Sequence, residues 1–261
     1  MIDVEVIHLA AATNDEYALY LGVMLESLLA NKVSKNPLKI YILYENISKQ
    51  NKFNLNEIVR KYNQDICFIS MANSVYDGFK VTEYITKEMY YRISISDLLD
   101  PNINKVLYLD CDLVVKKDIT KLWKTEMGDY FVAAVESASR NSRKEDLLIP
   151  DSYGYFNSGV LLINLAKWRQ HNISNNVIDF IKNNPSKLIY PDQDALNAIL
   201  YDKWLQLNPK WNYTSAHAKR LKKRNPAIIH FTGKKKPFGH LLEKEFFYYL
   251  NKITWDKTQD R

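Results

Sequence analysis

The sequence predicts an α/β fold with a mostly parallel central sheet and helices on both faces. Short apolar runs alternate with stretches whose apolar residues recur at helical spacing, a pattern typical of parallel sheets. The apolar run 106–109 is followed at once by two carboxylates, Asp110 and Asp112. Because ligands of such folds bind beyond the carboxyl ends of the strands, this second observation indicates a functional site there.

The first half of the chain shows the alternation most clearly. Ser48 is a suitable N-cap for the second helix, because its hydroxyl can accept a backbone N–H. The third helix runs up to Asp100-Pro101, and the residue before a proline disfavours helical geometry. We expect strands at residues 4–10, 38–44, 66–69 and 106–109, with helices between them at residues 17–29, 48–62 and 87–99.

The second half is less regular. We expect strands at residues 130–135, 159–164 and 227–230, and helices at residues 168–182, 192–200 and 240–251. There is no internal repeat and no low-complexity linker. We therefore expect one main domain, residues 1–240, and an aromatic and basic helical appendage, residues 241–261.

The composition excludes several classes of protein. Hydrophobic residues make up 46% of the 261 residues and charged residues 25%, which is ordinary for a soluble globular protein. No glycine-rich phosphate loop is present. The two cysteines, Cys67 and Cys111, lack metal-finger spacing, which favours a reduced, cytoplasmic protein. We expect neither a signal peptide nor a transmembrane helix, since no apolar run approaches roughly 18 residues.

Positive charge is concentrated near the C-terminus. Residues 203–261 hold 14 basic and four acidic residues, a net +10, so the rest of the chain carries −4 of the total +6. Two clusters, residues 219–224 and 234–236, favour an anionic partner or form a solvated face. Residues 219–224 contain no aromatic residue, so we do not expect nucleic acid. The final helix could contact the anionic inner face of the cell membrane, bind a partner, or pack on the domain.

Asp110 and Asp112 are candidates for a metal site. Residues two apart on an extended strand point the same way, and carboxylates select hard cations such as Mg²⁺, Mn²⁺ or Ca²⁺. Solvated loop carboxylates are the alternative. His230 ends a late strand, where it is either a packed histidine or a ligand that favours Mn²⁺ over Mg²⁺. Gly233 and Lys236 follow His230. A glycine lets the backbone approach a ligand closely, and a lysine ammonium binds phosphate, so the two together suit a diphosphate.

Two other polar segments could contact a polyhydroxyl ligand. Asn157 lies in Phe156-Asn-Ser-Gly159, which we interpret as a polar turn before an apolar strand. Asp192 begins an expected helix, for which it is a fair N-cap, and Gln193 and Asp194 would occupy the first turn.

These segments together resemble glycosyltransferase family 8, which includes bacterial lipooligosaccharide galactosyltransferases, general stress protein A and glycogenin. The motifs occur in the family's order and span about residues 5–240. They are Asn14-Asp-Glu-Tyr17, Tyr108-Leu-Asp110-Cys-Asp112, Phe156-Asn-Ser-Gly159, Val160-Leu-Leu-Ile-Asn164, Asp192-Gln193-Asp194-Ala-Leu-Asn197 and His230-Phe-Thr-Gly233 through Lys236-Pro237.

The resemblance implies a GT-A (Rossmann-like) fold, a UDP-hexose donor, and Mn²⁺ with Mg²⁺ as the alternative. It further implies transfer of galactose or glucose, with retention, to a saccharide, glycolipid or glycoprotein in cell-surface glycan synthesis. The implied metal ligands are Asp110, Asp112 and His230, and the implied catalytic residues are Gln193, Asp192, Asn157 and Arg92. The implied donor contacts are Ala11, Ala12, Asn14, Tyr17, Arg92, Asp110, Cys111, Asp112, Glu136, Gly233 and Lys236. Asn14 and Glu136 depart from the family pattern, in which Asp is common at both positions.

Two other functions fit parts of the sequence. Asp110-Cys-Asp112-Leu-Val114-Val115 also matches the nucleophile motif of haloacid-dehalogenase-type phosphatases. That motif usually opens a domain, and His230 stands where a phosphatase would need a carboxylate. A non-catalytic sugar-nucleotide-binding protein is the second alternative. Every expected donor-site position carries a suitable residue, which favours an enzyme.

Overall fold

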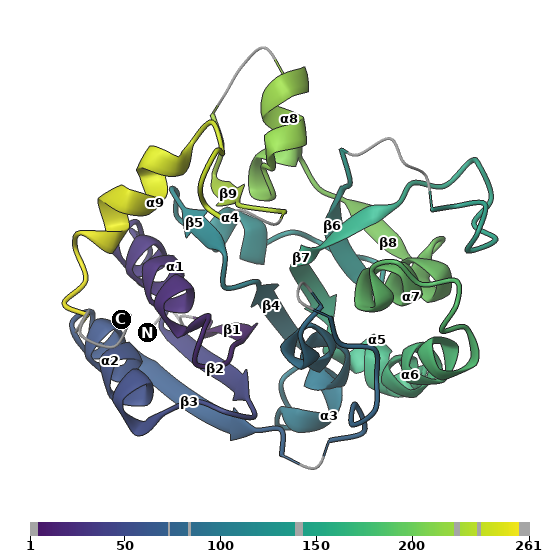
Figure 1. Cartoon of the computed structure of the whole chain (residues 1–261), viewed down its shortest axis with the longest axis horizontal. Helices are drawn as coiled ribbons and strands as arrows, with labels where there is room; N and C mark the ends of the chain where they lie inside the picture. The colour runs from purple at the N-terminus through teal and green to yellow at the C-terminus, as the bar shows by residue number, and fades with distance from the viewer. Residues whose placement is uncertain are drawn as a thin grey trace.

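A seven-stranded sheet in the order β3-β2-β1-β4-β7-β6-β8 forms the centre of the molecule (Figure 1). The structure, a computed structural model, describes residues 5–72, 74–82, 85–138, 143–221, 225–233 and 236–255. Six strands run in one direction and β7 runs against them, which confirms the mostly parallel sheet. The strands are β1 (Ile7–Ala12), β2 (Leu38–Tyr44), β3 (Asp65–Ser70), β4 (Lys105–Leu109), β6 (Val132–Glu136), β7 (Phe156–Asn164) and β8 (Trp204–Gln206).

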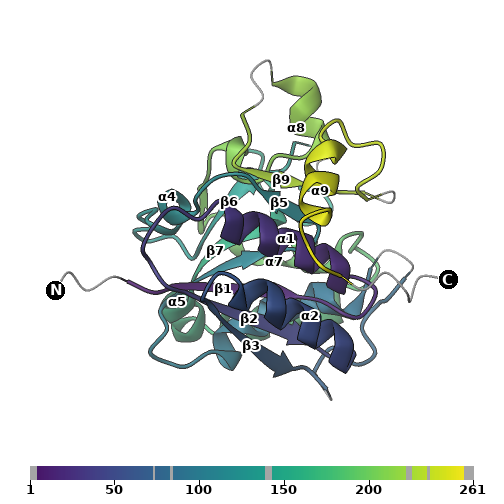
Figure 2. The ribbon, with the colours of Figure 1, turned by 90° about the vertical axis from the view of Figure 1, so that its left-hand side faces the viewer.

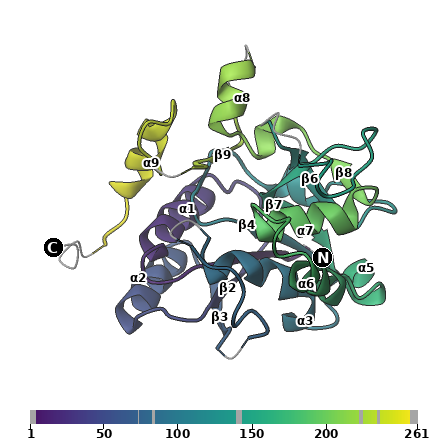
Figure 3. The ribbon, with the colours of Figure 1, turned by 45° about the vertical axis from the view of Figure 1, so that its right-hand side comes forward.

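Helices cover both faces of the sheet. Figure 2 shows α1 (Ala18–Ala30), α2 (Lys49–Arg60) and α9 (Glu243–Leu250) on one face. Figure 3 shows α3 (Ile95–Leu98), α5 (Leu165–Gln170), α6 (Ile173–Asn183) and α7 (Pro191–Leu200) away from α1 and α2. Strand alternation explains the two layers: Leu9 and Ala11 pack with α1, whereas Ala10 and Ala12 pack in the opposite cluster.

The strand order changes direction between β1 and β4. The chain moves from β1 outward to β2 and β3, and then returns to place β4 on the other side of β1. Such a switch point opens a crevice at the carboxyl ends of the two strands. The segments that follow Ala12 and Leu109 therefore lie next to each other.

A second, two-stranded sheet stands beyond this edge. It pairs β5 (Leu113–Val115) with β9 (Ile228–His230) in antiparallel register, so that Leu113 lies opposite His230. The predicted late strand ending at His230 is confirmed, whereas β5, which has only three residues, is not among the predicted strands. Pairing of β5 with β9 brings two motifs that are distant in the sequence to one place.

Several local predictions were wrong. The single helix expected at 87–99 is a 3₁₀ helix, η1 (Lys87–Ser94), followed by the short α3, and the carbonyl of Met89 accepts a hydrogen bond from Arg92 Nε. The helix expected at 168–182 is interrupted at Asn172, which has a left-handed φ of 53°. The expected turn at 156–159 is the start of β7, which pairs with a bulged β6.

The Ser48 N-cap is confirmed, because its hydroxyl accepts a hydrogen bond from the backbone N–H of Asn51.

The C-terminal helix α9 packs against α1. Phe246 and Tyr249 of α9 are buried in the core beside α1, and Trp255 follows them onto the same surface. A Cβ at Gly22 of α1 would lie 2.7 Å from the Trp255 ring. Of the alternatives left open by the sequence, packing on the domain is therefore observed. No helix among the described residues is long and apolar enough to cross a membrane.

Part of the basic C-terminal charge lies outside the described residues. These basic residues are Lys222, Lys223, Arg224, Lys234, Lys235, Lys257 and Arg261. The helix α8 (Ser215–Arg220), which holds the start of the first cluster, projects from the top of the molecule in Figures 1 and 3. The remaining helices are α4 (Thr120–Trp123) and the 3₁₀ helix η2 (Pro209–Trp211).

Asp118 fastens the segment after α1 to the start of α4. One carboxylate oxygen accepts the backbone N–H groups of Val33 and Ser34, and the other accepts that of Thr120, each at 2.7 Å. Burial alone would raise the pKa of Asp118. The hydrogen bonds from Thr120, Ser34 and Val33 outweigh burial and lower the pKa to about 2.

Replacing Asp118 by Ala should lower the free energy of unfolding by about 1–3 kcal/mol at neutral pH, because it leaves backbone donors unpaired. The folded-state pKa lies below the unfolded value, so the contribution is present above about pH 4 and lost as the pH falls toward 2. Urea denaturation of wild type and variant at pH 7 and pH 3 measures this. The matched control is Asp129→Ala, which removes an exposed pair with Lys167 and should cost under about 0.5 kcal/mol. Equal losses in the two variants would contradict the assignment.

Candidate active site

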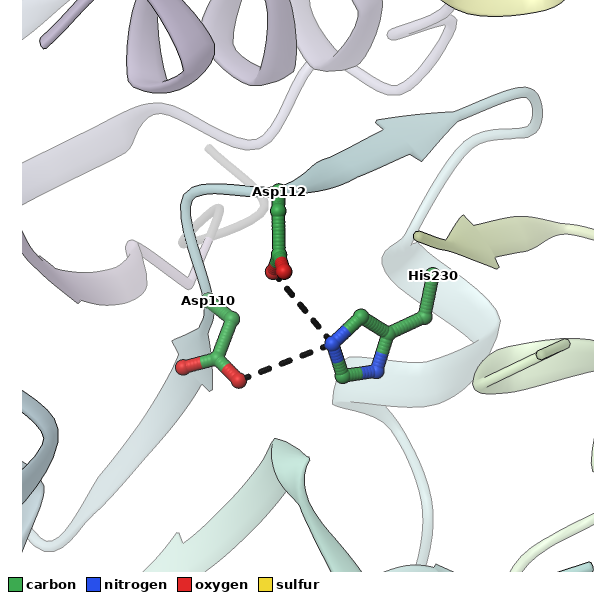
Figure 4. Close-up of side chains that lie close together, drawn as sticks. All are labelled: Asp110, Asp112 and His230. Carbon is green, nitrogen blue, oxygen red and sulfur yellow. Dashed lines mark ion pairs between the residues drawn. The ribbon is translucent and has the colours of Figure 1, made fainter. Parts of the chain in front are cut away.

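Three potential metal ligands converge at the carboxyl end of β4 (Figure 4). Asp110 follows β4, Asp112 precedes β5, and His230 ends β9. Their ligand atoms all lie within 4.8 Å of one another. His230 Nε2 is 3.3 Å from Asp112 Oδ1 and 3.7 Å from Asp110 Oδ2. Asp112 and His230 are buried, so charge gathered here is poorly screened by water.

Gly159 leaves the space that this cluster occupies. Its carbonyl accepts the N–H of Asp110 at 2.9 Å, which holds β7 against the start of the motif. A Cβ at Gly159 would lie 2.2 Å from His230 Cε1 and 2.7 Å from Asp110 Oδ2. Two carboxylates and an imidazole around such a cradle form a donor set suited to a divalent cation. The residues therefore fit a metal ion.

Two basic side chains neutralise the carboxylates in this structure. Arg92 donates to Asp110 Oδ1 at 2.8 Å, and Lys236 Nζ lies 2.6 Å from Asp112 Oδ2. Burial alone would raise the pKa of Asp112, but Lys236 and His230 outweigh it and hold the pKa below its ordinary value. Asp112 in turn raises the pKa of Lys236. Asp112 is thus ionised at neutral pH.

Arg92 links the metal-ligand cluster to the start of α7. Its buried guanidinium lies 3.2 Å from Asp192 and donates to the carbonyl of Ser158 at 2.6 Å. Burial raises the pKa of Asp192, and Arg92 opposes this increase. The expected helix N-cap at Asp192 is wrong, because Tyr190 occupies that position. One oxygen of Asp192, Oδ1, is buried and has no hydrogen-bond partner among the described residues.

Asn157 and Gln193, predicted from separate motifs, contact each other directly. Asn157 Nδ2 donates to Gln193 Oε1 at 2.9 Å, and the backbone N–H of Ser158 donates to the same oxygen at 3.1 Å. Gln193 Nε2 donates to the Tyr155 hydroxyl at 2.9 Å. The amide of Gln193 is therefore held on both sides by the protein.

The segment after β1 lies beside Lys236. The Asn14 side chain accepts the N–H of Tyr17 at 3.1 Å and donates to Glu88 at 3.2 Å. Lys236 Nζ is 5.6 Å from the centre of the Tyr17 ring, so this ring borders the metal-ligand cluster. The side chains of Ala11 and Ala12 are buried within the sheet.

The other predicted residues occupy more varied places. Cys111 packs partly buried against the core on the α1 side, and burial raises the pKa of its thiol. Gly233 has a φ of 106°, which an L-residue rarely adopts. Glu136 is exposed at the end of β6, where it accepts a hydrogen bond from Gln206 at 3.1 Å.

Two further residues of the site have no role predicted from the sequence. Asn212 is fully buried after η2, and its Oδ1 lies 2.8 Å from His230 Nδ1. It sits in an aperiodic segment that carries no motif, so nothing local signals its role. Tyr108 donates to Asp110 Oδ1 at 3.0 Å. A signal for Tyr108 was present, because it lies two residues before Asp110 in the strand.

The mostly parallel α/β sheet carries two carboxylates and a histidine at its switch point, the arrangement expected from the resemblance to GT-A glycosyltransferases. The family model for glycosyl transferase family 8 matches residues 8–240. General stress protein A of Bacillus subtilis (strain 168) is 38% identical, with 97% of this chain and 96% of the relative covered. The chain therefore belongs to glycosyltransferase family 8.

Two further comparisons agree with this assignment. A lipopolysaccharide 1,2-glucosyltransferase of Escherichia coli is 26% identical, covering 90% of this chain and 74% of the relative. The solved structure of the galactosyltransferase LgtC, in complex with donor and acceptor sugar analogs, superimposes with a TM-score of 0.87 at 25% identity. It covers 95% of this chain and 96% of its own. Membership of this family, together with this site, makes the protein a glycosyltransferase and excludes the phosphatase alternative.

Replacing Gly159 by Ala should weaken the binding of a divalent cation, for which Mn²⁺ is the probe, at least tenfold, because the new methyl group would displace His230 or Asp110. Isothermal titration of the purified protein with Mn²⁺ measures the dissociation constant. Gly154→Ala is the matched control, since its Cβ would approach the Trp204 ring at 2.9 Å instead. That variant should lose stability and keep its affinity for Mn²⁺. Wild-type affinity in Gly159→Ala would show that the cluster is not the metal site.

Proposed function

We propose that this glycosyltransferase moves a hexose, galactose or glucose, from a UDP-sugar to a saccharide acceptor with retention of configuration. The acceptor would be a saccharide, a glycolipid or a glycoprotein in cell-surface glycan synthesis. The similarity to a galactosyltransferase and a glucosyltransferase supports a hexose as the transferred sugar. The structural similarity to the galactosyltransferase extends over nearly the whole chain. Mn²⁺ is the proposed metal, with Mg²⁺ as the alternative, because the donor set includes an imidazole.

The observation that carries the proposal is the meeting of Asp110, Asp112 and His230 at the switch-point edge. These three residues would hold the metal ion. When bound, the ion supplies positive charge that neutralises the leaving diphosphate. Lys236, now paired with Asp112, lies close enough to this cluster to contact the same diphosphate.

The remaining proposed contacts follow the same edge of the sheet. Tyr17, beside Lys236, would stack on uracil near Asn14, where β1 ends. Ala11, Ala12 and Cys111 would form the backbone path along the nucleotide, and Gly233 would approach the diphosphate. Glu136 would border the sugar from the end of β6.

We propose that Arg92, Asp192, Asn157 and Gln193 form the sugar side. The unpartnered Oδ1 of Asp192 is a ready acceptor for a sugar hydroxyl in a buried position. The amide oxygen of Gln193 already accepts two N–H groups, so it is a poor nucleophile. We therefore favour same-face substitution. The acceptor oxygen bonds to the anomeric carbon as the bond to the diphosphate oxygen breaks, and its proton passes to that oxygen.

Wild-type protein should release UDP from UDP-galactose or UDP-glucose with Mn²⁺, and chelation should abolish this hydrolysis. Asp112→Asn should reduce the rate at least 100-fold, because it removes a charged ligand of the proposed metal. A coupled assay for UDP across both donors measures the rates. Asp129→Asn, at an exposed carboxylate, is the matched control and should be unaffected. Full hydrolysis by Asp112→Asn, or hydrolysis that survives chelation, would overturn the metal assignment.

The same-face mechanism predicts that no sugar becomes covalently bound to Asp192. Mass spectrometry of protein incubated with Mn²⁺ and a slow 2-fluoro donor analogue should show the unmodified mass. The control is a retaining glycosidase with a carboxylate nucleophile, which should be labelled by the corresponding fluorosugar. A hexosyl adduct on the peptide that contains Asp192 would replace this mechanism with double displacement.

We also propose peripheral contact with an anionic membrane through the exposed side of α9 and the segment before it. Leu241 and Tyr248 are more than half exposed there, beside the basic residues Lys244 and Lys252. The protein should float with phosphatidylglycerol vesicles at low salt and dissociate at high salt. Lys244→Glu/Lys252→Glu should lose flotation, whereas the control Lys121→Glu/Lys124→Glu, within and just after α4, should keep it. Salt-independent flotation, or none, would refute this contact.

A further inference from the structure

A line of side-chain hydrogen bonds leaves the metal-ligand cluster and reaches the sugar side. His230 Nδ1 lies 2.8 Å from Asn212 Oδ1, and Asn212 Nδ2 donates to Asn157 Oδ1 at 2.7 Å. Asn157 Nδ2 then donates to Gln193 Oε1 at 2.9 Å. Two amides thus separate a metal ligand from the residue proposed to lie beside the reacting carbon.

The line continues to a buried carboxylate. Gln193 Nε2 donates to the Tyr155 hydroxyl at 2.9 Å, and Tyr155 donates to Asp194 Oδ1 at 2.6 Å. The other oxygen of Asp194 accepts the backbone N–H groups of Ile189 and Tyr190. The carboxylate accepts hydrogen bonds from two sides, so every link points from the imidazole toward Asp194.

Two backbone groups fix this direction independently. Gly159 N–H donates to Asn157 Oδ1 at 3.1 Å, and Ser158 N–H donates to Gln193 Oε1 at 3.1 Å. A backbone N–H can only donate, so neither amide can exchange its oxygen and nitrogen without facing a donor with a donor. The orientations of Asn157 and Gln193 are therefore set by the start of β7.

The orientation of the imidazole follows from these amides. Because Asn157 presents its oxygen, Asn212 must present Nδ2 to it and Oδ1 to His230. His230 Nδ1 therefore carries a proton, which leaves Nε2, the nitrogen that faces Asp110 and Asp112, as the ring nitrogen that a metal ion could bind. A histidine that ligates through one nitrogen is commonly fixed by a hydrogen bond from its other nitrogen.

We propose that Asn212 is a positioning residue that holds His230 in the metal-binding tautomer and connects it to the amides of Asn157 and Gln193. The inference rests on the proposed function, since it assigns His230 to a metal and Gln193 to the sugar. Asn212 is fully buried, and both ends of its amide are used. One end serves the metal-ligand cluster and the other serves the sugar side, so substitutions can separate the two roles.

Two nearly isosteric variants make this separation. Asn212→Leu removes both bonds and should weaken Mn²⁺ binding about 10–100-fold, as expected for loss of a partner behind a ligand. Asn212→Asp keeps an acceptor for His230 and loses the donor to Asn157. The affinity of Asn212→Asp for Mn²⁺ should stay within about threefold of the wild-type affinity. Its kcat for UDP-sugar hydrolysis should fall at least tenfold. Calorimetry without any donor gives the Mn²⁺ affinity, and the UDP assay gives kcat.

The matched control is Asn197→Leu. Asn197 is equally buried and bonds to the backbone of Phe156 and Gln193, outside this line. It should lower the melting temperature as much as Asn212→Leu does and leave the Mn²⁺ affinity unchanged. If Asn212 served packing alone, every variant would lose stability, and Asn212→Asp would not lose kcat while keeping its affinity for Mn²⁺.

The outcomes are distinguishable. Mn²⁺ binding to wild type with unchanged affinity in Asn212→Leu would overturn this inference alone. Absence of Mn²⁺ binding and of UDP release in wild type would overturn the proposed function and the inference with it. If Asn212→Leu does not fold, Asn212→Asp decides: retained affinity with reduced kcat supports the role, and a tenfold loss of affinity refutes it.

Discussion

Two carboxylates and an imidazole are held together at the edge of this sheet. The Asp110 and Asp112 carboxylates repel each other unless positive charge lies beside them. In the structure, Arg92 pairs with Asp110 and Lys236 pairs with Asp112, which supplies part of that charge. The surrounding residues hold these carboxylates close together in a largely buried position despite their repulsion. That arrangement is what a site for a metal ion and a diphosphate requires.

The fold provides the grouping through three devices. Neighbouring β1 and β4 open the switch-point crevice, and the β5–β9 pairing sets His230 beside Asp112. Gly159 removes the methyl group that would fill the space. The start of β7 then does a second job. Its backbone N–H groups orient Asn157 and Gln193, so the metal-ligand cluster and the sugar side depend on one strand.

The sequence predicts the parts of this account that have local patterns. The parallel strands follow from their apolar runs, and Asp110 and Asp112 follow from their place after β4. The residue types made His230 and Lys236 candidates for the same site, and the family resemblance assigned them to it. No local pattern shows how they reach it, because a three-residue strand such as β5 is too short to reveal its pairing. Asn212 has no pattern at all. Its role comes from burial and from two partners that lie far from it in the sequence.

The most direct test of the central claim is a crystal structure of the protein grown with Mn²⁺ and UDP, examined by anomalous scattering at the manganese edge. The account predicts one strong peak bonded to Asp110, Asp112 and Nε2 of His230, with the diphosphate on its open side and Lys236 contacting a phosphate oxygen. A peak at other residues, coordination through Nδ1 of His230, or no peak between the two carboxylates would contradict it.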